Sequence, residues 1–550
     1  MPLSPCEESA VEATGIVLIS LLAVVLSGFV ARVTRLPLPL VQIALGAAIW
    51  FTRLDVAVLD PDVYFLLFLP PLLFLDGWRI PNDALRRDAS TILRLALGLV
   101  VFSVLGMGLF IHWLIPAMPL TVAFALAAVI SPTDPIAVSA IAARTPLPAR
   151  LMHILQGESL FNDASGLVCL QFAVAATLTG SFSLPVALLD FVWLALGGLA
   201  IGGGVTWLVA KATAWTAGRF GEDGGAQILT TLLIPFGVYL LAERLHCSGI
   251  LAAVAAGVTM SLTDLWPWRA AVRLRRTAVW DTVQLVANGS IFVLLGEQLP
   301  ALVAAMPQTV LATGHASPWW LALDGVLIMS ALVALRFAWV WVALRLSLAR
   351  ARRRGGPLPD AGWRVELVMS LAGVRGAVTL AGVLTLPALL HDGTPFPGRE
   401  PAVLLAAGVI VLSLLLATLA LPHALRGLAR PTSADMAQAE RSVRTAAARA
   451  AVEALSAALR TPASPCDTKR RAEAATALIA LYRQRIGRLG GGTPRRPRVL
   501  VDDVERELRL LAVRAERTAL PRPGHRLDHD EAALRGIVRE LDFQEARFGG

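Results

Sequence analysis

Long apolar segments follow one another from about Gly15 to Leu425, and no other feature constrains the fold as strongly. A helix needs about 20 mostly apolar residues to cross a bilayer. By this measure the sequence predicts about thirteen spans. Its 56% of hydrophobic and 16% of charged residues are typical of a chain that resides in lipid. The predicted spans are approximately 13–31, 37–52, 62–78, 90–115, 120–142, 151–178, 184–210, 226–244, 248–263, 282–302, 319–346, 365–390 and 401–425.

The composition becomes polar after these spans, which divides the sequence into a transmembrane part, 1–429, and a tail, 430–550. Apolar residues of the tail recur at spacings of three and four, as Val504, Leu508 and Leu511 do, which indicates amphipathic helices. We therefore expect an all-α polytopic membrane protein with a helical tail. The tail is predicted either to form a plain helical bundle or to regulate the transmembrane part or support its dimerisation.

Positive residues in the loops predict the orientation, because arginine and lysine collect on the cytoplasmic side of a membrane. They fall in alternate loops of the predicted topology, whereas the opposite loops hold little beyond Arg53 and Arg399. The N-terminus is therefore expected outside and the tail in the cytoplasm. Because the positive charge is spread over loops rather than gathered on one face, no nucleic-acid partner is expected.

The fifth predicted span contains Asp134 between two prolines, in the run Ser-Pro-Thr-Asp-Pro at 131–135. Proline lacks an amide hydrogen and clashes with the preceding turn, so the helix should break and leave carbonyl oxygens unpaired. Free carbonyl oxygens are cation ligands, and the aspartate can face the positive end of a half-helix. A simple proline kink without ligands is the alternative.

The sixth span carries four polar side chains close together. Ser159 and Asp163 are four residues apart and share a helix face, and Glu158 and Asn162 form the adjacent stripe. Hydroxyl, amide and carboxylate oxygens suit an alkali cation, and a carboxylate can carry a proton instead. A polar seam that only holds helices together is the alternative explanation.

Arg375 lies within the twelfth span and needs an anion, because an unpaired charge in lipid is costly. Glu158 is the predicted partner, in a structural ion pair that leaves Asp163 free to titrate. An anionic substrate is the alternative. Four further acids near span ends are expected to reach the interface, and two charged residues deeper in the eleventh span are expected to pair with neighbouring helices. The four are Glu243, Asp281, Glu297 and Glu366, and the two are Asp324 and Arg336.

An ordered set of motifs resembles the monovalent cation:proton antiporter-1 family, of the NhaP and eukaryotic NHE type, over nearly the whole chain. The set comprises FLPPLLFLDGW at 68–78, SPTDP at 131–135, QGESLFNDASGL at 156–167, SGILAAVAAG at 248–257, LLGEQLP at 294–300 and GVRGAVTLAGVL at 373–384. The resemblance implies an NhaA-like antiporter fold of two inverted six-helix repeats with crossed discontinuous helices. It also implies a homodimer in a bacterial inner membrane.

The resemblance also implies roles for single residues. Asp163 would carry the ion or the proton, with Asn162 beside it. Ser159 and the main-chain carbonyl of Thr133 would be further cation ligands, and Asp134 would compensate the helix ends. Asp76, at the end of the third span, would be an additional ligand.

The predicted function is a secondary antiporter that exchanges cytoplasmic Na+, or Li+ or K+, for external H+ by alternating access and serves pH and sodium homeostasis. The Asn162–Asp163 pair implies electroneutral exchange. The alternatives are a K+/H+ antiporter, a cation channel, or an intramembrane aspartyl protease with Asp134 and Asp163 as a dyad. The protease lacks support because no GxGD sequence is present. We expect neither an enzyme nor a cofactor, with Na+ and H+ as substrates and lipid as the surroundings.

Overall fold

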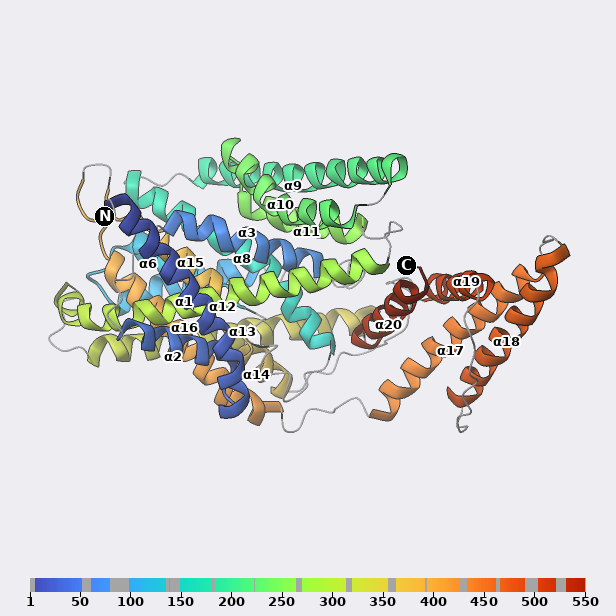
Figure 1. Ribbon diagram of the computed structural model, residues 1–550. Coiled ribbons are helices and arrows are strands. Elements are labelled where there is room, and N and C mark those ends of the chain that lie inside the picture. The colour runs from blue at the N-terminus through green and yellow to red at the C-terminus, as the bar shows by residue number, and fades with distance from the viewer. Residues whose placement is uncertain are drawn as a thin grey trace. The chain divides into compact units, whose positions relative to one another are not determined.

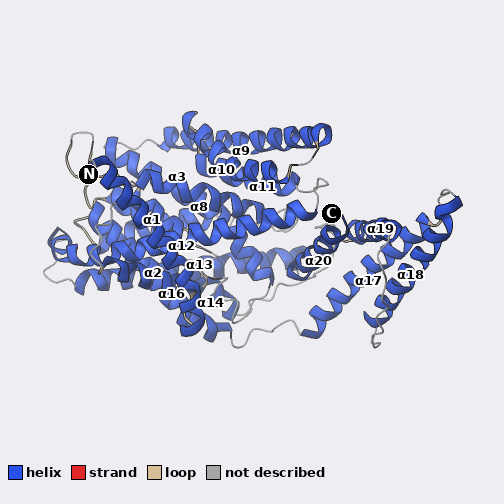
Figure 2. Cartoon of the chain, in the orientation of Figure 1, coloured by secondary structure: helices blue, strands red, loops and turns tan. Residues whose placement is uncertain are grey.

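The computed structural model divides the chain into two compact units, Met1–Thr263 with Asp281–Leu428, and Asp264–Trp280 with Ala429–Gly550. The described part of the chain is almost entirely helical (Figure 2), with an isolated β-bridge between Leu389 and Pro395. The described residues are 5–51, 61–79, 98–134, 138, 149–179, 184–221, 223–263, 270–312, 319–354, 363–390, 393–425, 433–460, 465–489, 503–520 and 531–549.

The helices up to residue 425 overlap the predicted spans, although the helices Leu184–Phe220 and Ala270–Ala312 are longer than predicted and residues 90–97 and 139–142 of two spans lie outside the described residues. The predicted all-α class is confirmed for the described residues. The helices are α1 (Pro5–Thr34), α2 (Leu38–Trp50), α3 (Pro61–Arg79), α5 (Leu99–Leu114), α6 (Leu120–Ile130), α8 (Ala149–Thr179), α9 (Leu184–Phe220), α10 (Gly224–Arg244), α11 (Gly249–Thr263), α12 (Ala270–Ala312), α13 (Trp319–Arg354), α14 (Trp363–Leu371), α15 (Ala377–Leu384) and α16 (Arg399–Leu425). Six described segments are long and apolar enough to cross a membrane, and others are apolar but shorter. The count of thirteen crossings and the inverted repeats stay predictions.

Two spans are interrupted, the fifth where its prolines predict a break and the twelfth in agreement with the discontinuous helices that the resemblance implies. Helix α6 ends at Ile130, directly before the segment that contains Pro132, and residues 131–134 are not helical. The twelfth span consists of α14 and α15, which are separated by the non-helical residues 372–376. The two interruptions meet, because the main-chain N–H of Asp134 donates to the Val374 carbonyl at 2.7 Å.

Small residues bring several helices of the first unit into close contact. Figure 1 shows α9, α10 and α11 side by side, and α11 also packs along α3. A Cβ atom on Gly257 would lie 2.1 Å from the Phe74 carbonyl oxygen, and one on Gly202 would lie 2.0 Å from that of Ala252. Lipid provides no hydrophobic drive for helix association, so such close backbone approach stabilises the packing by van der Waals contact.

Helix α12 packs on α1 and α2 in the same manner. A Cβ atom on Gly46 would lie 1.9 Å from the Val293 carbonyl oxygen, and one on Gly296 would lie 2.1 Å from that of Ile43. Beside this contact Glu297 is only 3% exposed and accepts a hydrogen bond from the Ser20 hydroxyl at 3.3 Å. The expected interfacial position of Glu297 is therefore wrong, because neighbouring helices cover its side chain.

The other acids near span ends differ among themselves. Asp281 has a side chain that is 55% exposed and pairs with Arg79 at 2.7 Å, which agrees with the expected interfacial position. Glu366 is buried in the first turn of α14 instead. Glu243 accepts a hydrogen bond from the Gly249 amide at 3.1 Å and so caps the start of α11.

The second unit is a helical bundle, which agrees with the helices predicted for the tail. Its helices are α17 (Ser433–Ala458), α18 (Pro465–Leu489), α19 (Asp503–Ala519) and α20 (Glu531–Gly549). The core is built from small and aliphatic residues such as Ala451, Leu455, Leu478 and Leu508. This unit also includes the segment 264–280, which the sequence analysis assigned to the transmembrane part.

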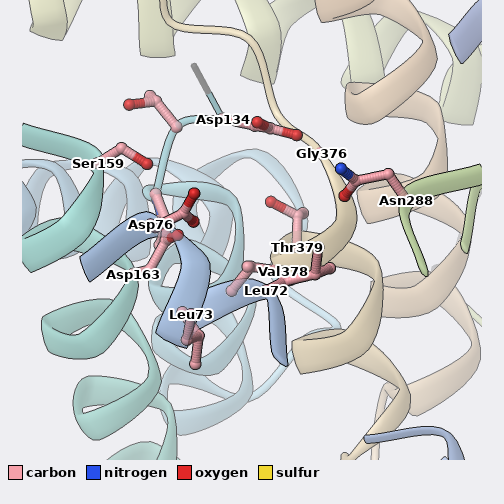
Figure 3. A pocket seen from close by; sticks show the side chains of 12 residues that line it. Leu72, Leu73, Asp76, Asp134, Ser159, Asp163, Asn288, Gly376, Val378 and Thr379 are labelled. Carbon is pink, nitrogen blue, oxygen red and sulfur yellow. The ribbon is translucent and has the colours of Figure 1, made fainter. Parts of the chain in front are cut away.

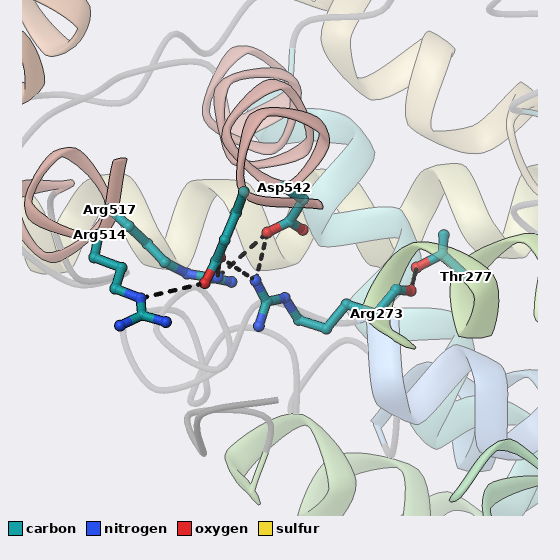
Figure 4. Close-up of polar contacts among 6 residues, drawn as sticks. Arg273, Thr277, Arg514, Arg517 and Asp542 are labelled. Atoms are coloured by element: carbon teal, nitrogen blue, oxygen red, sulfur yellow. Dashed lines mark hydrogen bonds and ion pairs between the residues drawn. The ribbon is translucent and has the colours of Figure 1, made fainter. Parts of the chain in front are cut away.

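An ion-pair cluster joins this segment to α19 and α20 within the second unit (Figure 4). Arg273 donates to Asp542 at 2.7 Å and to Glu545 at 3.0 Å. Arg517 lies 3.3 Å from Asp542 and 3.0 Å from Glu545. Because the side chains of Arg273 and Asp542 are only 12% and 9% exposed, these charges are screened less than surface pairs.

Candidate functional site

A small pocket lies where the interrupted helices meet α3, α8 and α12, and Figure 3 shows its lining side chains. Three of them are carboxylates, Asp76, Asp134 and Asp163. The full lining is Leu72, Leu73, Asp76, Pro132, Thr133, Asp134, Ser159, Asp163, Asn288, Gly376, Val378 and Thr379. Five of the six predicted ion-binding residues therefore lie together, although they come from three separate segments of the sequence.

Helix α8 brings Ser159 and Asp163 to the pocket from one face, because the two are four residues apart. Both are buried, at 3% and 5% exposure. Asp76 reaches the same pocket from the last part of α3, beyond the proline pair Pro70-Pro71. Two carboxyl groups and a hydroxyl thus open onto one small volume.

Asn162 is the predicted ion-binding residue that does not line the pocket. Its side-chain amide donates a hydrogen bond to the Thr133 hydroxyl at 2.9 Å, and the residue is 1% exposed. Thr133 itself lines the pocket from the non-helical segment after α6. The structure thus places Asn162 behind the pocket wall, where it holds Thr133 in position.

Asp134 lies against the start of α15. Gly376 is the N-cap residue of α15, and a Cβ atom there would lie 1.9 Å from Oδ2 of Asp134. A carboxylate at a helix N-terminus compensates the partial positive charge of the unpaired amides. This position beside Gly376 agrees with the prediction that Asp134 faces the positive end of a half-helix, and its role in compensating that end stays a prediction.

The predicted ion pair between Glu158 and Arg375 is wrong. Glu158 is fully buried and instead binds Arg336 of α13, whose Nη1 and Nη2 donate to its two carboxylate oxygens at 2.6 and 3.1 Å. Nε of Arg336 also donates to the Met369 carbonyl at 2.9 Å, near the end of α14. The expectation that Arg336 pairs with a neighbouring helix is confirmed.

Arg375 offsets the partial negative charge at helix ends and does not pair with the carboxylate of Glu158. Its Nε donates to the Ile130 carbonyl, the last of α6, at 2.9 Å, and its guanidinium donates to the Gly373 carbonyl. Within the described residues the structure records no ion pair for Arg375. The C-terminal ends of half-helices carry partial negative charge, which explains why a buried cation is stable here.

Two lining residues were missed by the sequence analysis, Asn288 of α12 and Thr379 of α15. Asn288 is a polar residue within the predicted span 282–302, and Thr379 lies within the motif run 373–384. A search for neutral polar residues inside spans would have found both. Neither residue is ionisable or a helix breaker, and residues of those two kinds stand out most in an apolar span.

The arrangement suits a small cation that competes with protons. Carboxylate and hydroxyl oxygens are hard ligands for alkali ions, and carboxylates bind protons at the same atoms. The interrupted helices bring oppositely charged helix ends to the pocket, and Asp134 and Arg375 compensate them. The pocket therefore offers oxygen atoms of the kinds that bind a small cation or a proton.

Comparisons with known proteins agree with this chemistry. The family model described as "Sodium/hydrogen exchanger, transmembrane" matches residues 17–427. The chain is 38% identical over 542 residues to an Escherichia coli (strain K12) protein named as the uncharacterized Na(+)/H(+) exchanger YjcE, covering 96% of this chain and 98% of that protein. It is 40% identical over 412 residues to a Bacillus pumilus (strain SAFR-032) protein named as a sodium, potassium, lithium and rubidium/H(+) antiporter, covering 74% of this chain and 60% of that protein.

A solved structure shares the fold. It is the sodium proton antiporter MjNhaP1 from Methanocaldococcus jannaschii, with a TM-score of 0.57 and 20% sequence identity, and the match covers 76% of this chain and 99% of that one. At this identity the likeness concerns the fold alone. Together with the family model, which spans the apolar part of the chain, these matches establish that the chain belongs to the sodium/hydrogen exchanger family of membrane cation/proton antiporters.

Proposed function

We propose that this protein exchanges cytoplasmic Na+ for external H+, one ion for one proton, through competition at Asp163. The observation that carries the proposal is the buried position of Asp163 in a pocket that it shares with Asp76, Ser159 and Thr133. A carboxylate among hard oxygen ligands can bind either a cation or a proton. The neutralised carboxyl then permits alternating access of the site to the two sides of the membrane.

The relatives support a monovalent cation as the substrate class. The name of the Bacillus pumilus relative includes sodium, potassium, lithium and rubidium, and that of the Escherichia coli relative includes sodium. We propose Na+ as the principal ion for this chain, with Li+ and K+ as competing substrates. The protein would then serve pH and sodium homeostasis as a homodimer in the bacterial inner membrane, with its second unit in the cytoplasm as a regulatory or dimer-supporting domain.

The exchange is tested in everted vesicles that carry the protein, with a fluorescent dye that reports internal pH. Addition of Na+ should release protons from wild-type vesicles and should have no effect with Asp163→Asn. Asp190→Asn is the matched control, because Asp190 is an exposed aspartate on α9 outside the pocket. If wild-type vesicles move no protons with Na+, Li+ or K+ at any pH, the antiport proposal fails.

Electroneutral exchange is tested separately. Asn162 stands beside Asp163 and supports Thr133, so one carboxylate rather than two adjacent ones is available at this position of α8. In proteoliposomes, an imposed membrane potential should leave the exchange rate unchanged. Acceleration by the potential would contradict a ratio of one to one. A channel, by contrast, would dissipate a sodium gradient without moving protons.

A further inference from the structure

The pocket has two chemically different walls. Its charged wall comes from α3, α8 and the segment after α6 and holds three carboxylates. Its other wall comes from α12 and α15 and holds the neutral polar residues Asn288 and Thr379, together with Val378 and Gly376. Figure 3 shows Asn288 and Thr379 reaching toward the pocket from their own helices. The neutral wall has no part in proton exchange as proposed above.

Thr379 differs from three other threonines in apolar helices of this chain. Thr177, Thr385 and Thr418 each donate to a main-chain carbonyl three or four residues earlier. Thr379 is 2% exposed, yet among the described residues its hydroxyl has no recorded hydrogen bond. Because Thr379 lines the pocket, its hydroxyl is available to a water molecule or an ion there.

Asn288 shows the same feature on α12. It is flanked by the buried residues Ala287 and Gly289, and its own side chain is half-buried at the pocket. Within the part of the chain that the structure describes, its amide makes no recorded hydrogen bond, whereas Gln284, one turn earlier, accepts one from Arg79. A polar side chain within a membrane-spanning helix is expensive and usually functional.

We propose that Asn288 and Thr379 supply neutral oxygen ligands that determine which alkali cation the site prefers. This inference rests on the proposed antiport function. A neutral oxygen adds no charge, so it leaves the competition between cation and proton at the carboxylates intact. It changes instead how well the pocket replaces the hydration shell of each ion.

The size of the ion decides the direction of the effect. Attraction between an ion and an oxygen strengthens as their separation shortens. Loss of one oxygen ligand therefore weakens binding of Li+ most, Na+ less and K+ least, while water replaces part of what is lost. The half-saturating concentrations should rise by about tenfold for Li+ and about twofold for K+, which corresponds to the modest energies of single neutral hydrogen-bonding groups.

The test compares isosteric variants in the vesicle assay with a series of Li+, Na+ and K+ concentrations. Thr379→Val and Asn288→Leu remove an oxygen with little change of shape, and each should shift the ratio of half-saturating concentrations for Li+ and K+ about fivefold toward K+. Thr379→Ser retains the hydroxyl and should keep the wild-type ratio. Ser290→Ala is the matched control, because Ser290 is buried on α12 outside the pocket lining.

The ratio does not depend on how much protein folds, so partial loss of expression leaves the test intact. An unchanged ratio in both Thr379→Val and Asn288→Leu overturns this inference while antiport itself stands. If one of these variants yields no folded protein, the other still decides. A shift that also appears in Ser290→Ala overturns it as well, because the effect would then come from helix packing. Absence of antiport in the wild type is a different result and concerns the proposed function.

Discussion

Glu158 on α8 and Arg336 on α13 form a bidentate ion pair, with donor–acceptor distances of 2.6 and 3.1 Å. Both side chains are almost completely buried, at 0% and 3% exposure. Glu158 lies five residues before Asp163 on α8. It therefore ties α8, which carries the proposed ion-binding carboxylate, to α13 and through Met369 to α14.

Breaking this pair from one side should destabilise the protein strongly. Arg336→Met leaves the Glu158 carboxylate buried without its cation, and such a loss costs about 3–5 kcal/mol. The midpoint of thermal unfolding in detergent should fall well below that of the wild type. The double variant Glu158→Gln with Arg336→Met removes both charges and should recover much of the loss. A single variant as stable as the wild type would contradict the pairing.

Gly376→Ala should impair transport, because the new methyl group would lie 1.9 Å from Oδ2 of Asp134. The carboxylate must move away from the N-terminus of α15 or the helix must shift. We expect a loss of at least about tenfold in exchange rate, since overpacking of this kind costs about 1–3 kcal/mol. Gly408→Ala on α16 is the control, because nothing lies within 4 Å of a Cβ atom there. Normal exchange by Gly376→Ala would show that the position of Asp134 is not needed.

Gly296→Ala should separate α12 from α2. A Cβ atom on Gly296 would approach the Ile43 carbonyl oxygen to 2.1 Å, so the two backbones cannot keep their contact. We expect a loss of about 1–3 kcal/mol in stability, measured by thermal unfolding in detergent. Gly28→Ala on α1 has open space around its Cβ atom and should behave as the wild type. Equal stability of both variants would argue against close packing of α2 on α12.

The ion-pair cluster of the second unit should respond to pH through Asp542. Burial raises the pKa of Asp542 from 3.8 to about 6, although Arg517 and Arg276 lower it. The Asp542 carboxyl therefore binds its proton more tightly in the folded unit than in the unfolded chain. The stabilisation that protonation of Asp542 gives the folded unit is fully present below about pH 4 and is lost as pH rises through about 6. Its size is at most about 3 kcal/mol, since one pH unit corresponds to about 1.4 kcal/mol.

Hydrogen exchange of the amides of α20 in the full-length protein measures this effect. After correction for intrinsic exchange, protection should fall between pH 5 and pH 7 in the wild type. Asp542→Asn cannot titrate and should show a flatter profile. Arg273→Ala removes a cation that donates to Asp542 at 2.7 Å and should lower protection at pH 7. The charged groups that face Asp542 are Arg273, Arg276, Arg517 and Glu545. A pH profile shared by the wild type and Asp542→Asn would assign the dependence to other groups.

Local chemistry explains which features of the candidate site were predictable. Pro132 cannot donate to the helix ladder, so the end of α6 at Ile130 follows from the sequence. Ser159 and Asp163 share a face of α8 because the helical repeat places residues four apart on one side. The apolar spans themselves follow from the length that a bilayer demands.

The sequence by itself determined the apolar helices, the break after α6 and the cluster of polar side chains on α8. Only the tertiary structure decided that Glu158 binds Arg336, 178 residues away, and that Arg375 serves main-chain carbonyls. It also decided that Asn288 of α12 faces the carboxylates. The physical reason is that helices apolar on every side carry no amphipathic pattern that tells which face meets which neighbour. Those contacts depend on close backbone packing at residues such as Gly46 and Gly296, and that packing exists only when the helices assemble.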